Sequence, residues 1–201
     1  MWPTEHVCTS WTIVPQRIIE KYGEVTLAVD LMAVNKIPLM IMTSRDTFRG
    51  CWVHMQQDKS TLMTSIAQVP WTYKARGFWI CNILADGSFE CIRNGLSEMC
   101  IALNIASRNK HVPEIEWYIM TVKEWVKAIT NTLPFKRYPP RLIAEMVSNI
   151  LFWLNSFLHN DRVNMAISPR NLIIELAIDY NKHCLIAFGT TCRYMRKGTT
   201  P

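Results

Sequence analysis

Three carboxylates in this sequence have the types and positions from which a metal site is built. Asp30 lies within one extended apolar stretch, Asp86 ends another, and Glu116 lies near the start of a helical repeat. Acids are rare on buried central strands unless they are paired or bind a metal ion. Two Asp and one Glu that converge form a hard, all-oxygen site, which suits Mg²⁺ or Mn²⁺.

Each of these acids also has a plain structural interpretation. Asp30 can be an acid at a strand edge, and Asp86 with Gly87 can form an ordinary Asp-Gly turn. Glu114 competes with Glu116 as the third carboxylate, although an acid so near a helix start is useful simply against the helix dipole. The choice between Glu114 and Glu116 stays open at this point.

Residues 109–133 are expected to form the helix that carries the third acid. Apolar residues recur there at steps of three and four, which is helical periodicity; they are Val112, Ile115, Ile119, Val122, Val126 and Ile129. Pro113 suits a first helical turn, and Pro134 ends the run.

One flank of this helix carries Glu116 followed by Lys123 and Lys127. A carboxylate with lysines further along the same flank can hold a metal ion beside a phosphate backbone. The alternative is a solvated charged face, which is what a charge run on a helix usually is.

Short strands must position the two aspartates. The alternation and turn residues predict strands at 24–35, 37–43, 51–56, 78–85 and 101–105. Further helices are expected after residue 58 or 60, at 140–157 and at 168–176, and a short strand or extended piece at 184–194. Pro70 should kink or end the first of these helices. This order predicts the α/β class, with a five-stranded mixed sheet flanked by helices.

The predicted topology brings two of the acids to one part of the sheet. The strand with Asp30 should be central, and the strand before Asp86 should lie next to it. Asp86 then lies at the carboxyl edge of the sheet, where ligands of α/β sheets tend to bind.

The composition favours a globular chain with an anionic partner. Of 201 residues, 49% are hydrophobic and 19% are charged, which excludes disorder. The formal charge of +6 favours nucleic acid or an acidic membrane surface. A membrane is disfavoured, because no apolar run reaches roughly 18 residues and no basic amphipathic helix is present. The N-terminus has no signal-peptide pattern, so an intracellular protein is expected.

The cysteines and histidines exclude two other kinds of site. The seven cysteines are odd in number and include no C-x-x-C pair, so a disulfide framework is not expected. The five histidines do not combine with them at zinc-ligand spacings.

Five segments together resemble the integrase core of Ty1/copia-type retrotransposons, most closely the divergent copia-type polyproteins of algae and other protists. The resemblance covers residues 20–194. The segments are VTLAVDLMAVNKIPLMIMTSR, FWICNILADGSFECI, HVPEIEWYIMTVKE, NTLPFKRYPPRLI and SPRNLIIELAIDYNKHCLIAFGT. A lone Asp-Gly or a lone Glu on a helix would be weak evidence for this family, but the five segments in this order are specific for it.

The resemblance implies an RNase H-like fold and a DDE-type polynucleotidyl transferase. Its catalytic and metal-binding acids fall on Asp30, Asp86 and Glu116, and Lys123 with Lys127 would contact DNA. It implies two Mg²⁺ (or Mn²⁺) ions and no small-molecule cofactor. The activity would be DNA 3′-end processing and strand transfer, with element ends and target DNA as partners, in the cytoplasm and nucleus. Homo-oligomerisation is left open.

The resemblance divides the chain into an N-terminal arm at 1–22, a catalytic core at 23–160 and a copia-type C-terminal extension at 161–201. A second interpretation is a catalytically decayed retroelement fragment that binds nucleic acid at most nonspecifically. Trp117, Met120 and Trp125 stand where related copies as a rule carry arginine, and Pro70 lies within a predicted helix. These four residues favour that second interpretation.

Overall fold

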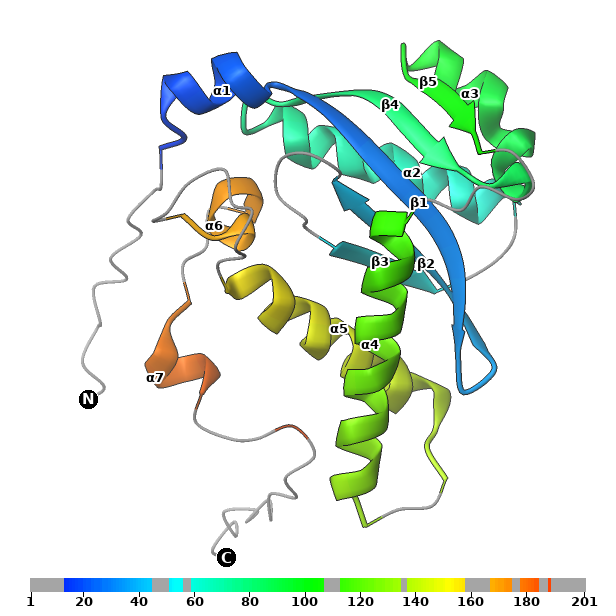
Figure 1. Ribbon diagram of the computed structural model, residues 1–201, viewed down its shortest axis with the longest axis vertical. Coiled ribbons are helices and arrows are strands. Elements are labelled where there is room, and N and C mark those ends of the chain that lie inside the picture. The colour runs from blue at the N-terminus through cyan, green and yellow to red at the C-terminus, as the bar shows by residue number, and fades with distance from the viewer. Residues whose placement is uncertain are drawn as a thin grey trace, which may run out of the picture.

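A five-stranded mixed sheet forms the centre of the molecule (Figure 1). The computed structural model describes residues 13–44, 51–55, 59–106, 113–134, 137–157, 167–174, 178–184 and 188. The strand order is β3-β2-β1-β4-β5. The strands are β1 (Glu24–Val34), β2 (Ile37–Ser44), β3 (Cys51–Met55), β4 (Trp79–Ala85) and β5 (Ala102–Ile105). The predicted sheet is therefore confirmed, with strand ends shifted by one residue.

The strand with Asp30 is central, as expected. β1 pairs antiparallel with β2, which pairs antiparallel with β3. On its other side β1 pairs parallel with β4, which pairs parallel with β5. The β1–β2 turn has positive φ at Asn35 (50°) and Lys36 (67°), as a type I′ hairpin turn requires.

Helices cover both faces of the sheet. They are α1 (Gln16–Tyr22), α2 (Lys59–Lys74), the 3₁₀ helix η1 (Gly87–Ile92), α3 (Arg93–Glu98), α4 (Pro113–Thr132), α5 (Pro140–Ser156), α6 (Pro169–Ile174) and α7 (Tyr180–His183). The helix predicted at 109–133 is α4, and its residues 109–112 lie outside the described part. The extended tail predicted at 184–194 lies almost entirely outside it too, and α7 was not predicted.

Two apolar cores lie on opposite faces of β1. Leu27 and Val29 point into a core formed with α1, α2, α3 and α6. Ala28 and Met32 point into the other core, which is formed with α4 and α5. Because side chains alternate along a strand, Asp30 belongs to the face that α4 and α5 cover.

Pro70 does not end α2, so of the two predicted outcomes, a kink or an end, the end is excluded. The helix continues for one more turn to Lys74, although proline removes the hydrogen bond to the carbonyl of Ile66 and costs about 3 kcal/mol. Tyr73 lies in that last turn and is fully buried, as is Ile66 on the same stripe. Burial of the stripe therefore offsets the cost of the proline.

The described parts of both terminal segments pack onto the core beside α2. Ile18 of α1 and Leu172 and Ile173 of α6 are buried in it. The Arg76 side chain donates from Nε to the Leu172 carbonyl at 2.9 Å and from Nη2 to the Asn171 carbonyl at 3.4 Å. The division at residues 22 and 160 stays a prediction. Across the described residues, no helix combines the length and apolar character needed to cross a bilayer.

Candidate functional site

Asp30 lies at the carboxyl half of β1, opposite Ile41 of β2. Its side chain is half-buried on the face that α4 covers, and Oδ1 accepts a hydrogen bond from the Leu31 backbone N–H at 2.7 Å. The carboxylate therefore stands on a central strand at the boundary between apolar core and solvent.

Asp86 directly follows β4 and lies at the same level of the sheet as Asp30. In the parallel β1–β4 ladder, Ala28 pairs with Leu84. This is the last pair of the ladder, and each aspartate is two residues beyond it. The prediction that the strand before Asp86 lies next to the strand with Asp30 is confirmed. That the two acids meet stays a prediction.

The Asp86 side chain also has a local structural role. It is the N-cap of η1, and Oδ1 accepts hydrogen bonds from the Ser88 backbone N–H at 2.9 Å and from the Ser88 hydroxyl. The residue is exposed. A carboxylate has about four acceptor positions, so this cap leaves acceptor capacity for another ligand.

Glu116 lies in the first part of α4, which packs over β1. Its neighbour Ile115 is buried in the core with Ala28, whereas Glu116 is half-buried at the rim of the helix. Lys123 and Lys127 are exposed. Their spacing of 7 and 11 residues from Glu116 puts them on its flank of the helix.

The side chains of the three acids do not form a finished metal site. Within the described ranges, no three Asp, Glu, His or Cys side chains come together as a group that could hold a metal ion. The structure thus places Asp30 and Asp86 two residues beyond the last pair of one parallel ladder and packs α4 over β1, but it does not cluster the three carboxylates within the described residues. Their donor chemistry and backbone positions fit a hard divalent cation. The metal-ligand role of the three residues stays a prediction, and so does the choice of Glu116, because the side chain of Glu114 is outside the described part.

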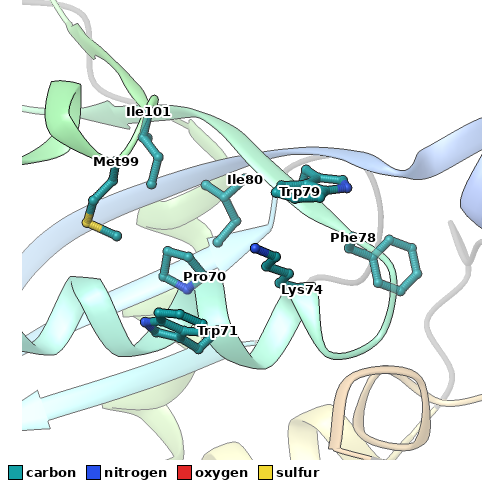
Figure 2. Close-up of a pocket in the computed structure, with 8 residues that line it drawn as sticks. All are labelled: Pro70, Trp71, Lys74, Phe78, Trp79, Ile80, Met99 and Ile101. Carbon is teal, nitrogen blue, oxygen red and sulfur yellow. The ribbon is translucent and has the colours of Figure 1, made fainter.

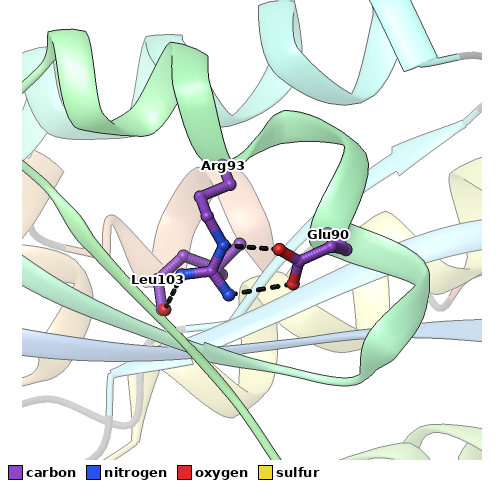
Figure 3. Close-up of polar contacts among 3 residues, drawn as sticks. All are labelled: Glu90, Arg93 and Leu103. Atoms are coloured by element: carbon purple, nitrogen blue, oxygen red, sulfur yellow. Dashed lines mark hydrogen bonds and ion pairs between the residues drawn. The ribbon is translucent and has the colours of Figure 1, made fainter.

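A network next to Asp86 ties η1 to the edge of the sheet (Figure 3). Arg93 Nε and Nη2 donate to the two carboxylate oxygens of Glu90 at 2.6 and 2.8 Å. Arg93 Nη1 donates to the Leu103 carbonyl of β5 at 2.9 Å. The hydrogen bonds with Arg93 lower the pKa of Glu90, and those with Glu90 raise the pKa of Arg93. The bidentate pair holds the segment that begins at Asp86 against β5.

Two solved structures with similar folds are retroviral integrase catalytic cores. The catalytic core domain of BIV integrase matches with a TM-score of 0.52 and 12% identity, over 75% of this chain and 93% of that one. The HTLV-2 integrase catalytic core domain, in complex with magnesium and in a trimeric form, matches with a TM-score of 0.51 and 11% identity, over 76% and 97%. This chain has the fold of an integrase catalytic core. It is thus RNase H-like, as the sequence predicted.

The similarity to integrase cores was found by comparison of structures and not by comparison of sequences. No protein-family model matches the sequence, and no curated protein matches it. The narrower assignment to the Ty1/copia type therefore stays a prediction.

Sequence reasoning missed an aromatic pocket on the other face of the sheet. Trp71 and Trp79 are 68% and 57% exposed and flank the ammonium group of Lys74 (Figure 2). For Trp71 a signal was available, because it lies off the buried stripe that runs through Ile66 and Tyr73. For Trp79 the sequence gave no such signal, because a residue on a strand near the edge of a sheet can be either buried or exposed.

Proposed function

We propose that this chain is the catalytic core of a retrotransposon integrase, which carries out metal-dependent DNA 3′-end processing and strand transfer. The observation that supports this most is the placing of Asp30 and Asp86 beyond one parallel ladder. Each lies two residues past the Ala28–Leu84 pair of β1 and β4, and α4 packs over the face of β1 that carries Ala28. The integrase-core fold supports it further. Proteins with this function act on DNA, so we expect this one in the cytoplasm and nucleus.

Asp30, Asp86 and Glu116 would hold the metal, which is Mg²⁺ or Mn²⁺. A bound divalent cation supplies Lewis-acid polarisation of a phosphate oxygen and stabilises charge on the oxygens that attack and leave. The HTLV-2 core was solved in complex with magnesium, which favours the same metal here. Two ions are expected from the resemblance to copia-type integrases.

The exposed lysines on α4 would position the DNA. Lys123 and Lys127 lie about two and three turns beyond Glu116 on the same flank. Their ammonium groups can therefore pair with phosphates of a strand whose scissile phosphate lies near the acids. In strand transfer, a DNA 3′-hydroxyl oxygen forms a bond to a target phosphorus while the bond to the target's own bridging oxygen breaks. Self-association is also proposed, since the HTLV-2 core is described in a trimeric form.

A second candidate function is that of a decayed fragment that binds nucleic acid without catalysis. Three observations favour it. The carboxylates do not cluster within the described residues, Asp86 already serves as a helix cap, and large apolar side chains are exposed on α4. These are Trp117 (49%), Met120 (61%) and Trp125 (40%).

Metal binding and strand transfer together test the proposal. We expect calorimetry to detect Mn²⁺ binding by the wild-type chain and to lose it in Asp30→Asn and Glu116→Gln. Glu124→Gln removes an exposed acid from another side of α4 and should bind as the wild type does. The active chain should then join a labelled duplex end to target DNA.

The outcomes separate the two candidates. A folded wild-type chain that binds no Mn²⁺ and joins no DNA ends would refute the catalytic proposal and leave the decayed fragment. Binding lost in Asp30→Asn but kept in Glu116→Gln would move the third carboxylate role away from Glu116, with Glu114→Gln as the next variant.

A further inference from the structure

A small apolar pocket lies on the α2 face of the sheet, at the opposite end of β4 from Asp86 (Figure 2). Its volume is about 230 Å³. The residues that line it come from α2, β4 and the α3–β5 connection: Pro70, Trp71, Lys74, Phe78, Trp79, Ile80, Met99 and Ile101. Since pockets for drug-sized ligands measure about 300–1,000 Å³, this one suits a single ring system.

Two indoles and one cation dominate the pocket. Lys74 Nζ lies 4.9 Å from the ring centroid of Trp79 and 5.8 Å from that of Trp71. Figure 2 shows the lysine side chain reaching between the two rings. Lys74 is the charged residue among the eight that line the pocket, and no carboxylate is among them. The pocket therefore offers aromatic faces together with a positive charge.

Both rings remain open to solvent because of the way the sheet is built. The pairing of β5 with β4 begins only at Asn82 opposite Ala102, so β5 does not extend alongside Trp79. Trp71 lies in the last turns of α2, beside the buried stripe, and is 68% exposed. Two exposed tryptophans around one cavity form an apolar surface of the kind that marks interaction sites.

The chemistry of this surface indicates its ligand. Indole faces favour planar rings, which stack on them, and the ammonium group favours an anion close to the ring. A nucleotide has both parts, a base and a phosphate. Proteins that bind single strands combine aromatic side chains that stack on bases with positive charge along the backbone. The chain's charge of +6 fits such a partner.

We propose that this pocket, the Trp71–Trp79 pocket, binds one nucleotide of a single-stranded nucleic acid. The base stacks on the exposed indoles and Lys74 pairs with the adjoining phosphate. The pocket supplies only one cation and one stacking site, so a strand that makes further contacts outside the pocket binds more tightly than a free nucleotide. This inference rests on the proposed function only in taking nucleic acid as the partner. Trp79 begins β4, so the pocket is about 20 Å from Asp86 along the strand and does not involve the carboxylates.

Fluorescence anisotropy of a short labelled oligothymidylate, titrated with the full chain at several KCl concentrations, tests this inference. We expect Trp79→Ala to weaken binding roughly 5- to 100-fold, the range for loss of one base–aromatic stack, and Trp79→Phe to keep most of the affinity. Lys74→Gln should reduce the slope of log K against log [KCl] by about 0.7, the value for one phosphate contact with a single strand. Trp125→Ala, which removes an exposed tryptophan on the other face, is the matched control.

Wild-type affinity and salt slope in a folded Trp79→Ala and a folded Lys74→Gln would overturn the inference. Binding of a proline-rich peptide that depends on Trp79, with no such dependence for the oligonucleotide, would overturn it in favour of a peptide site. Equal affinity for thymidine monophosphate and for the strand would also overturn it. A folded wild-type chain that binds the oligonucleotide through Trp79 but joins no DNA ends would refute the catalytic proposal and leave the pocket intact.

Discussion

Asp86 combines a helix cap with a place in the proposed metal site. Its Oδ1 accepts hydrogen bonds from the Ser88 backbone N–H and hydroxyl. Like Asp30, Asp86 lies two residues beyond the last pair of the β1–β4 ladder. The cap uses the hydrogen-bonding capacity of the side chain, whereas a metal site uses its negative charge. Two substitutions can therefore separate the two roles.

At this residue we expect Asp86→Asn to keep the stability and lose the metal. Asn caps helices about as well as Asp, so the free energy of unfolding should change by only a few tenths of a kcal/mol. Asp86→Ala removes the cap and should cost about 1 kcal/mol. Urea unfolding measures the change in the free energy of unfolding for both variants. Mn²⁺ calorimetry should show that both have lost metal binding.

Two results would contradict this division of roles at residue 86. If Asp86→Asn destabilises as much as Asp86→Ala does, the Ser88 hydrogen bonds are not the source of the stability. If Asp86→Asn keeps the Mn²⁺ affinity of the wild type, Asp86 is not a metal ligand.

At the scale of elements, α2 contains a proline in its interior, and burial of one side of the helix offsets the cost. Pro70 lies inside the helix, and the last turn continues to Lys74 because Tyr73 is buried against the sheet. Pro70→Ala restores an N–H that can donate to the carbonyl of Ile66. We expect it to raise the free energy of unfolding by about 3 kcal/mol in urea denaturation.

The control for this prediction is Thr72→Ala, a change to alanine in the same part of the helix. It should shift the free energy of unfolding by less than about 1 kcal/mol, because it alters helix propensity and one hydrogen bond to the Gln68 carbonyl. A Pro70→Ala variant no more stable than the wild type would show that the helix is already adapted to the proline.

At the scale of the whole molecule, α6 belongs to the same core as α2. Leu172 is 1% exposed and packs in the core that also contains Ile66 and Leu27. Leu172→Ala should cost about 2–5 kcal/mol and shift a single cooperative unfolding transition. Ile13→Ala, at a side chain that is 83% exposed, should have almost no effect.

That experiment also tests the boundary predicted at residue 160. A loss of less than about 1 kcal/mol, or a separate early transition for the C-terminal part, would show that residues 161–201 form a unit independent of the core. A full loss would show that a core ending at residue 160 is incomplete.

The sheet could be predicted from the sequence because its strands are short, apolar and bounded by turn residues. The alternation around Asp30 and the Asp-Gly after β4 were enough to place both acids at one part of the sheet. The continuation of α2 through Pro70 could not be predicted, because local propensity gives no measure of how deeply Tyr73 is buried. The Trp71–Trp79 pocket depends on contacts between residues of three separate elements, so no single stretch of sequence contains it. The side-chain position of Asp86 likewise depends on the cap it forms at η1, which the Asp-Gly pattern only partly indicated.

The cap at the start of η1 has a consequence for how such a chain would change over generations. Selection for a stable fold alone would keep a capping residue such as Asp or Asn at position 86. Its loss would lower the stability of any copy, active or not. Glu116 lies within α4, where many residue types sustain a helix, so selection for folding alone would constrain the residue type there less. In a lineage released from selection for strand transfer, Glu116 should therefore be replaced before Asp86. If the proposed function holds, the residue at position 116 is then the better marker, among relatives of this chain, of a copy that retains strand transfer.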